Sequence, residues 1–443
     1  MGEWAHPNLE APVRARAQIS LRPSRGSPNL PLAPSPPRPP SRLALTPSGS
    51  LTDAPSMTCG GRRLFFLSLL IVSFLIKQTG YAGQAPKQDY LVYVVCEAAD
   101  QIALIRFGPQ GARVEKLIET GSMPSDIDGP HGIVVSPDKK FYYVSLGHGR
   151  PFGSVWKYST ADDSVLARVT LGNFPATMDI SSDGGLLYVV NFNLHGDMVP
   201  SSVSIVATQP MIEVARVQTC TMPHGSRINP QGSKQYSACM MDDLLAEIDT
   251  NTLKVSRHFV LTKGKEMGMN GSPSSHSMGM NHDAGGHGME PPKPGDTSCS
   301  PTWAQPTPDG KSVLVACNKS DEIVEIDATT WKVNRRIPAR PGVYNLAVSK
   351  DGKLIATNKR DQSVSVYELK SGRELARIPT KRKVIHGATI SPDNRYAFIS
   401  VEGIGAEPGT VEVIDLESLK TVATVDLPEQ AAGIDFFKIE PAK

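Results

Sequence analysis

Short apolar runs of about six residues recur along residues 89–439, and Asp-Gly, Pro-Asp or other glycine-containing turns separate them. Runs of this length between such turns predict β-strands joined in antiparallel hairpins. One repeat unit begins at Pro130, passes a turn at 136–138 and continues through three further strands to Leu171. The pattern therefore predicts four short strands per unit.

This unit occurs six times, beginning near residues 130, 175, 223, 301, 343 and 385. A seventh unit is split between the ends of the repeat region: residues 89–119 supply outer strands, and Gly433–Ile439 supplies an inner strand. Radial repetition of four-stranded units is typical of β-propellers. We predict an all-β, seven-bladed β-propeller over residues 83–443, with the ring closed by a C-terminal strand in the N-terminal blade.

The repeats also resemble a known family. Tyr188–Asn191 reads Tyr-Val-Val-Asn and Ala356–Asn358 reads Ala-Thr-Asn, each after an Asp-Gly turn and before a strand ending such as Ile326-Asp327. On these residues the chain resembles the YVTN-family β-propeller repeat proteins over essentially all of 89–439. The resemblance implies the fold. It does not indicate one function, because this family is similar to lactonases, surface-layer proteins and the propeller of nitrous oxide reductase alike.

The first 82 residues do not share this pattern. Residues 1–56 hold 12 of the chain's 37 prolines and predict a disordered extension, or a start placed too early, with Met57 the true first residue. Residues 57–82 show a basic start, an apolar run at 64–76 and small residues at the end, as in a secretory signal peptide. A short membrane anchor is the alternative. We expect a periplasmic or secreted product with no stable membrane span.

The net charge of the repeat region limits the expected partners. Although the whole chain has a net charge of +2, residues 83–443 are mildly acidic, with 37 basic and 41 acidic residues. Nucleic acid is not an expected partner, since binding to phosphates depends on clustered Lys and Arg. The expected partners are a metal ion and a periplasmic or cell-surface protein.

Aligning the units on their turns places one position at the start of every innermost strand. Three of its seven occupants are histidine: His131, His224 and His386. The other four are Ala176, Thr302, Tyr344 and Ala432. Because innermost strands line the channel, these histidines should form a rim at one mouth, and loops on the same face hold His148 and His195. The alternative is that Pro-His-Gly is only a favoured turn sequence.

An irregular insertion at 263–297 adds soft ligands. Its central part, 266–290, combines thioethers and imidazoles with Gly, Asn and Ser and shows no helical or strand period. The residues are Met267, Met269, His276, Met278, Met280, His282, His287 and Met289. Methionine in such a segment does not serve core packing. Thioethers with imidazoles suit Cu(I), and the histidines alone suit Cu(II) or Zn(II). We predict a copper capture segment, with zinc as the other metal and a ligand-free linker as the alternative.

The cysteines indicate an oxidising compartment. Cys220 with Cys239, and Cys299 with Cys317, should be neighbours at the histidine face, so two disulfides are expected and Cys96 is left over. Thiolate ligation of a metal by Cys96, Cys239 and Cys317 is the alternative.

Motifs for catalysis are scarce. The sequence has no Gly-x-Ser-x-Gly, His-Glu-x-x-His or Cys-x-x-Cys-His, and it lacks the Cys-x-x-x-Cys site that accompanies nitrous oxide reductase. Glu97 and Glu402, in loops of the histidine face, could complete a metal site or act as bases. The leading hypothesis is an exported copper-binding propeller that is not an enzyme. The alternatives are a binding scaffold without metal and a lactonase-like or metal-dependent enzyme.

Overall fold

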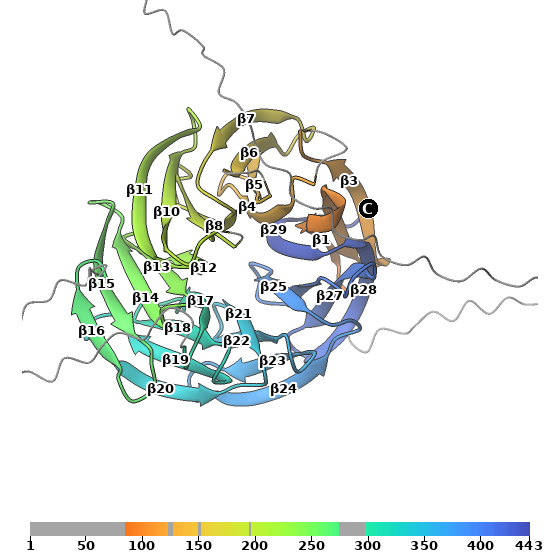
Figure 1. The fold of residues 1–443 in the computed structure, drawn as a ribbon. Coiled ribbons are helices and arrows are strands. Elements are labelled where there is room, and N and C mark those ends of the chain that lie inside the picture. The colour runs from red at the N-terminus through yellow and green to blue at the C-terminus, as the bar shows by residue number, and fades with distance from the viewer. Residues whose placement is uncertain (1–84, 123–126, 149–151, 195, 274–296) are drawn as a thin grey trace, which may run out of the picture. The chain divides into compact units, whose positions relative to one another are not determined.

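The computed structural model describes residues 85–122, 127–148, 152–194, 196–273 and 297–443. Seven antiparallel sheets stand as blades around a central axis (Figure 1), which confirms the all-β, seven-bladed β-propeller. Within these ranges the single helical element is a 3-10 turn, η1 (Glu97–Ala99). No helix in the described part of the chain is long and apolar enough to cross a membrane.

Each blade has four strands in radial order, and successive strands pair antiparallel. The innermost strands are β4 (Pro130–Val135), β8 (Pro175–Ile180), β12 (Pro223–Ile228), β17 (Pro301–Pro306), β21 (Val343–Val348), β25 (Ile385–Ile390) and β29 (Ala431–Pro441). The second strands are β1 (Gln88–Cys96), β5 (Phe141–Leu146), β9 (Leu186–Asn191), β13 (Lys234–Cys239), β18 (Ser312–Cys317), β22 (Lys353–Asn358) and β26 (Tyr396–Val401).

The third and outer strands complete the blades. The third strands are β2 (Gln101–Gly108), β6 (Ser154–Ser159), β10 (Pro200–Ala207), β14 (Leu244–Asp249), β19 (Glu322–Asp327), β23 (Ser363–Glu368) and β27 (Pro408–Asp415). The outer strands are β3 (Gly111–Glu119), β7 (Val165–Thr170), β11 (Ile212–Thr221), β15 (Lys254–Val260), β20 (Val333–Pro338), β24 (Arg373–Pro379) and β28 (Lys420–Glu429).

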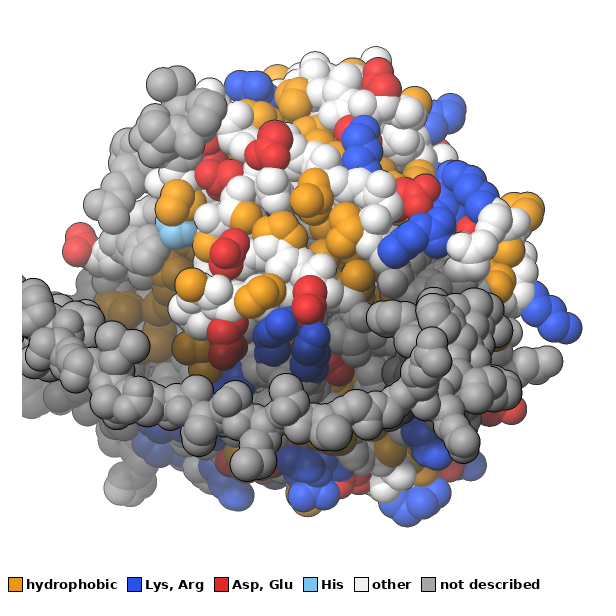
Figure 2. All heavy atoms as spheres, turned by 90° about the vertical axis from the view of Figure 1, so that its right-hand side faces the viewer, with side chains coloured by type: hydrophobic (Ala, Val, Ile, Leu, Met, Phe, Trp, Pro, Cys, Tyr) orange, Lys and Arg blue, Asp and Glu red, His pale blue; other side chains and the backbone are white. Residues whose placement is uncertain are grey.

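The core lies between the faces of neighbouring blades. Val92 and Phe107 of the first blade pack against Phe398 and Val411 of the last. Second strands are covered on both faces, which explains why they read as nearly continuous apolar runs. Outer strands are half exposed, and on the side seen in Figure 2 acidic, basic and hydrophobic side chains are interspersed.

The innermost strands of neighbouring blades approach too closely for a Cβ atom between them. A Cβ added to Gly132 would lie 2.2 Å from the carbonyl oxygen of Ala176, and one added to Gly225 would lie 2.5 Å from that of Thr302. Blade packing therefore explains the glycine that follows His131 and His224. It does not explain the histidines themselves.

The ring is closed in the N-terminal blade, as predicted. Strand β29 pairs with β1 from Cys96 opposite Ala431 to Gln88 opposite Pro441, so the inner strand is longer at both ends than the expected 433–439. The same blade contains Arg106, a fully buried guanidinium on β2. It forms ion pairs with Asp89 on β1 at 2.8 Å, with Glu440 on β29 at 2.7 Å and with Glu115 on β3 at 2.9 Å. A buried charge of this kind is tolerated only while its partners remain in place.

The insertion departs from the prediction at its beginning. Met267–Asn270 forms β16, a fifth strand that pairs with β15, so the expectation that 266–290 lacks strand structure is wrong for these residues. The edge of β15 offers unpaired backbone groups, and pairing satisfies them. Gly268 allows the close contact, because a Cβ there would lie 2.3 Å from Cδ1 of Trp331. Residues 274–296 lie outside the described residues.

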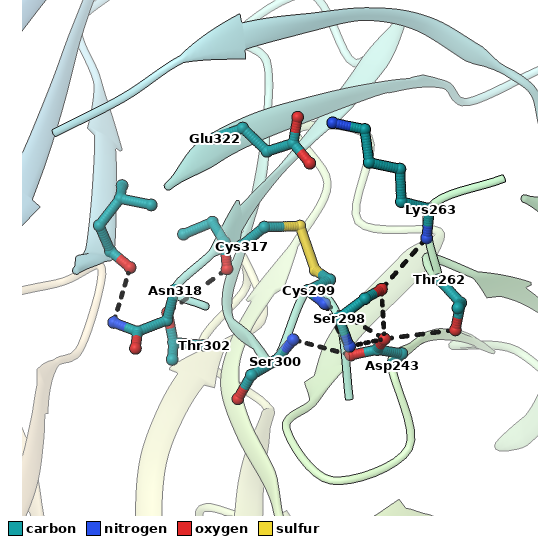
Figure 3. The surroundings of a disulfide bond; sticks show 12 residues. Asp243, Thr262, Lys263, Ser298, Cys299, Ser300, Thr302, Cys317, Asn318 and Glu322 are labelled. Carbon is teal, nitrogen blue, oxygen red and sulfur yellow. Dashed lines mark hydrogen bonds between the residues drawn. A yellow bond between two sulfur atoms is a disulfide. The ribbon is translucent and has the colours of Figure 1, made fainter. Parts of the chain in front are cut away.

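Both expected disulfides are present. Cys220–Cys239 joins the outer strand of one blade to the second strand of the next, and Cys299–Cys317 lies at the entry to the following blade (Figure 3). Beside the second disulfide, the buried Asp243 carboxylate holds both ends of the insertion. It accepts hydrogen bonds from the Thr262 hydroxyl at 3.2 Å and from the backbone N–H of Ser298 at 2.6 Å.

Ring closure predicts a large loss of stability on truncation. Deleting residues 432–443 removes the buried Phe436 and Phe437, each worth roughly 1.5–3 kcal/mol, and it also removes Glu440 from Arg106. We expect the free energy of unfolding in urea, followed by circular dichroism, to fall by several kcal/mol. The matched variant Glu440→Gln keeps the strand and should lose less. A truncated chain as stable as the intact one would contradict closure by β29.

Candidate metal centre

Three histidines from three innermost strands meet at one mouth of the channel. His131 on β4, His224 on β12 and His386 on β25 are 8%, 1% and 3% exposed. One ring nitrogen of each lies within 4.8 Å of the others. The structure therefore brings together the three residues that the repeat alignment placed at one position.

Hydrogen bonds set the tautomers of two of these rings. Nδ1 of His131 lies 2.8 Å from Oε2 of Glu97, and Nδ1 of His224 lies 2.8 Å from the carbonyl oxygen of Thr302. Because carboxylate and carbonyl oxygens only accept hydrogen bonds, we assign the proton to Nδ1 in both rings. Each Nε2 then carries a lone pair, and the buried Nε2 of His131 has no partner among the described residues.

In the third ring, His386, it is Nε2 rather than Nδ1 that lies near a carboxylate oxygen. Nε2 of His386 lies 3.7 Å from Oε1 of Glu402, and its buried Nδ1 has no partner in the described part of the chain. The same carboxylate oxygen lies 3.4 Å from Nζ of Lys359. The carboxylate favours a proton on Nε2, which leaves the lone pair of His386 on Nδ1.

Tyr344 and Lys359 complete the rim. The Tyr344 hydroxyl donates a hydrogen bond of 2.8 Å to Nε2 of His224, and Lys359 Nζ lies 3.7 Å above the Tyr344 ring. A metal ion on His224 Nε2 would displace this hydroxyl. Although burial lowers the pKa of Lys359, Tyr344 and Glu402 raise it more, so its ammonium stays charged.

Burial determines the charge of the rings. It lowers the pKa of His224 to about 3 and holds the pKa of His386 well below its ordinary value, with the charge of Lys359 adding to the effect at His386. Both imidazoles are therefore neutral at pH 7, the form that binds metals. Burial alone would raise the pKa of Glu97. Electrostatic attraction and a hydrogen bond from His131, with a hydrogen bond from His148, outweigh the effect of burial, and the net pKa of Glu97 is lowered.

The remaining predicted ligands are distributed differently. His148 contacts Glu97 Oε1 at 3.2 Å, so it joins the cluster through that carboxylate. Met267 and Met269 lie on β16 at the outer edge of a blade, away from the channel (Figure 1). The expectation that the insertion emerges at the rim is therefore not met by these two residues. His195, His276, Met278, Met280, His282, His287 and Met289 lie outside the described residues.

The thiolate alternative is wrong for two of its three cysteines. The sulfur atoms of Cys239 and Cys317 are in disulfides. Cys96 is free but buried, and burial raises the pKa of its thiol to about 12. At neutral pH this group is a protonated thiol.

Several residues of the site were missed or given no role. Thr302 and Tyr344 occupy the same position in the repeat alignment as the histidines, so the alignment could have identified them as residues of the site. Met222, Met240 and Met241 pack with Phe174 and Phe192 in one cluster, and the ring of Phe192 lies 4.8 Å from His224. No strand period links these methionines, so only the fold reveals that they lie together.

The geometry suits a metal ion with nitrogen ligands. Three buried imidazoles, each beside a carboxylate or carbonyl oxygen, match the arrangement in which such an oxygen orients a metal-binding ring. At metal–nitrogen distances of about 2.0–2.1 Å, ligand nitrogens are about 3.3 Å apart. Separations of up to 4.8 Å therefore require only small side-chain shifts for all three to reach one ion. Three protein ligands leave a further coordination position open.

Comparison with known proteins supports the architecture. A family model described as "Lactonase, 7-bladed beta-propeller" matches residues 84–195, which include Glu97, His131 and His148. The chain has the fold of the lactonase-type propellers. No curated protein matches the sequence.

Solved structures agree with this assignment of the fold. The periplasmic gluconolactonase of Pseudomonas aeruginosa is 14% identical with a TM-score of 0.59, over 79% of this chain and 99% of that one. A functionally unknown protein from Desulfotomaculum acetoxidans is 14% identical with a TM-score of 0.57, over 78% and 98%. Hydrazine synthase of Kuenenia stuttgartiensis is 20% identical with a TM-score of 0.50, over 68% and 80%. Such identities establish the fold alone.

The lowered pKa of His224 predicts acid sensitivity. The unfolded chain binds a proton at His224 near pH 6.5, whereas the folded chain does so only near pH 3, so stability falls as pH drops below about 6.5. From pH 7 to pH 5.5, the metal-free protein should lose about 1 kcal/mol more than the His224→Gln variant. Urea unfolding at both pH values measures this difference. Equal losses in the two proteins would contradict a neutral, buried His224.

Proposed function

We propose that this protein is an exported β-propeller that binds copper through His131, His224 and His386. The observation that carries the proposal is the convergence of three buried imidazoles, two of which keep a nitrogen without a hydrogen-bond partner in the described residues. A buried, unsatisfied polar group costs about 1–3 kcal/mol. A metal ion on these nitrogens would recover that energy, whereas a purely structural role gives no reason for it.

Copper is preferred to zinc for two reasons. Divalent copper binds nitrogen sites more tightly than zinc does, and thioethers select Cu(I). Beside the rim, Met222, Met240 and Met241 share a cluster, and we propose that the segment 266–290 captures copper with its own methionines and histidines. Zinc remains the competing metal at the histidines alone.

We also propose that the protein is exported and that it exchanges copper with a protein partner. Two disulfides are typical of oxidising compartments, and they agree with the expected signal peptide at 57–82. A periplasmic or cell-surface protein would supply copper to this site or receive it.

Copper titration tests the site. With a chromophoric Cu(I) chelator as competitor, the protein should bind at least one Cu(I). The variant with His131→Gln, His224→Gln and His386→Gln should bind at least tenfold more weakly. His258→Gln is the matched control, because His258 is equally buried but bonds to the carbonyl oxygen of Gly271 on the outer part of a blade. Equal affinities of the triple variant and the intact protein would contradict the histidine site.

The role of the insertion is tested separately. Deleting residues 274–296 and joining 273 to 297 by a short linker keeps β16 and the contacts of Asp243. This variant should bind fewer Cu(I) ions and load the remaining site more slowly. Unchanged stoichiometry and rate would remove the insertion from the proposal and leave the histidine site intact.

A lactonase-like hydrolase is the second candidate function, and the family match over 84–195 favours it. An open metal position beside Lys359 and Tyr344 would supply an activated water in such a reaction. If this candidate holds, hydrolysis of gluconolactone above the spontaneous rate should be lost with a chelator and with His224→Ala. Hydrolysis that persists under both treatments would separate the activity from the histidine site, and no rate above background would exclude gluconolactone as a substrate.

A further inference from the structure

Beside His131 and His386, the channel contains a small cavity. Its volume is about 30 Å³, and His131, His386, Trp303, Asn345 and Arg227 are among the residues that line it. The walls are innermost strands in close backbone contact, as at Gly132 against the carbonyl of Ala176. The cavity therefore cannot widen without separating blades.

Four of the residues that line the cavity each have a buried polar atom with no hydrogen-bond partner among the described residues. These atoms are Nε2 of His131, Nδ1 of His386, Nε1 of Trp303 and Oδ1 of Asn345. Trp303 and Asn345 are each 3% exposed. Most buried polar groups in proteins are paired, so the unpaired Trp303 and Asn345, on a cavity that His131 and His386 also line, indicate a bound ligand there.

The chemistry of the four atoms limits this ligand. The indole N–H of Trp303 only donates a hydrogen bond, the Asn345 carbonyl oxygen only accepts one, and the two histidine nitrogens carry lone pairs. A volume of about 30 Å³ holds an ordered water but no sugar-sized molecule. The ligand is therefore small and polar, with one to a few non-hydrogen atoms.

We propose that this cavity is a binding site for water, hydroxide or a small linear anion, which coordinates the metal ion from the channel side. Trp303 donates a hydrogen bond to the ligand, and Asn345 accepts one from it when it carries a proton. The bond to the metal rests on the proposed function, whereas the two hydrogen bonds do not.

Azide is a suitable probe, because its binding to Cu(II) produces a charge-transfer absorption band and changes the electron paramagnetic resonance spectrum. In the Cu(II)-loaded protein, azide should bind at a single site. Trp303→Phe, which keeps an aromatic ring beside Arg227, should weaken azide binding about tenfold through the loss of one hydrogen bond to an anion. Trp156→Phe is the control, since its Nε1 bonds to Ser154 Oγ on a third strand. Azide affinity unchanged by Trp303→Phe would overturn the proposal.

The metal-free protein separates this inference from the proposed function. With 15N-labelled tryptophan, the Trp303 indole proton, assigned by its absence in Trp303→Phe, should show a magnetisation transfer to a long-lived water. If copper fails to bind but the water signal is present, the metal site is wrong and the polar cavity site stands. If the Trp303 indole proton shows no transfer to a long-lived water, or if azide affinity does not depend on Trp303, the cavity site is wrong.

Discussion

The structure depends on the contact between neighbouring innermost strands around the channel. The carbonyl of His131 occupies the space where Gly433 would carry a Cβ, and the Thr177 hydroxyl donates to the carbonyl of His224. Each of these two residues at the start of an innermost strand is thus held in place by a contact between its backbone carbonyl and the blade before it. Its side chain is left to face the mouth of the channel, so the ring geometry itself presents the three imidazoles to one another.

The same constraint couples site and stability. The N-terminal blade contains the junction between the chain ends, because β29 pairs with β1 there. Arg106 joins all four strands of that blade through three carboxylates. The neutral rings of His224 and His386 are compatible with this packing, whereas charged rings at the same depth would need compensating charges.

Much of this was predictable from the sequence because repetition supplies an internal alignment. The register placed His131, His224 and His386 at one position and paired the cysteines correctly. The repeat alignment also placed Tyr344 at this position, but its role was not predictable, because the alignment does not show that its hydroxyl bonds to His224. Arg106 looked like an ordinary strand residue, since its partners lie on three other strands. The strand at 267–270 was missed because its pairing depends on the free edge of β15, and its own residues show no period.

Asp243 gives the insertion an unusual freedom. Its carboxylate binds Thr262 before the insertion and Ser298 after it, so the two ends are held together by the blade rather than by the residues between them. Closing a longer loop between fixed ends adds only about 0.6 kcal/mol for each doubling of length. Over evolutionary time, residues 274–296 can therefore gain or lose members, and with them methionines and histidines, without altering the rest of the propeller.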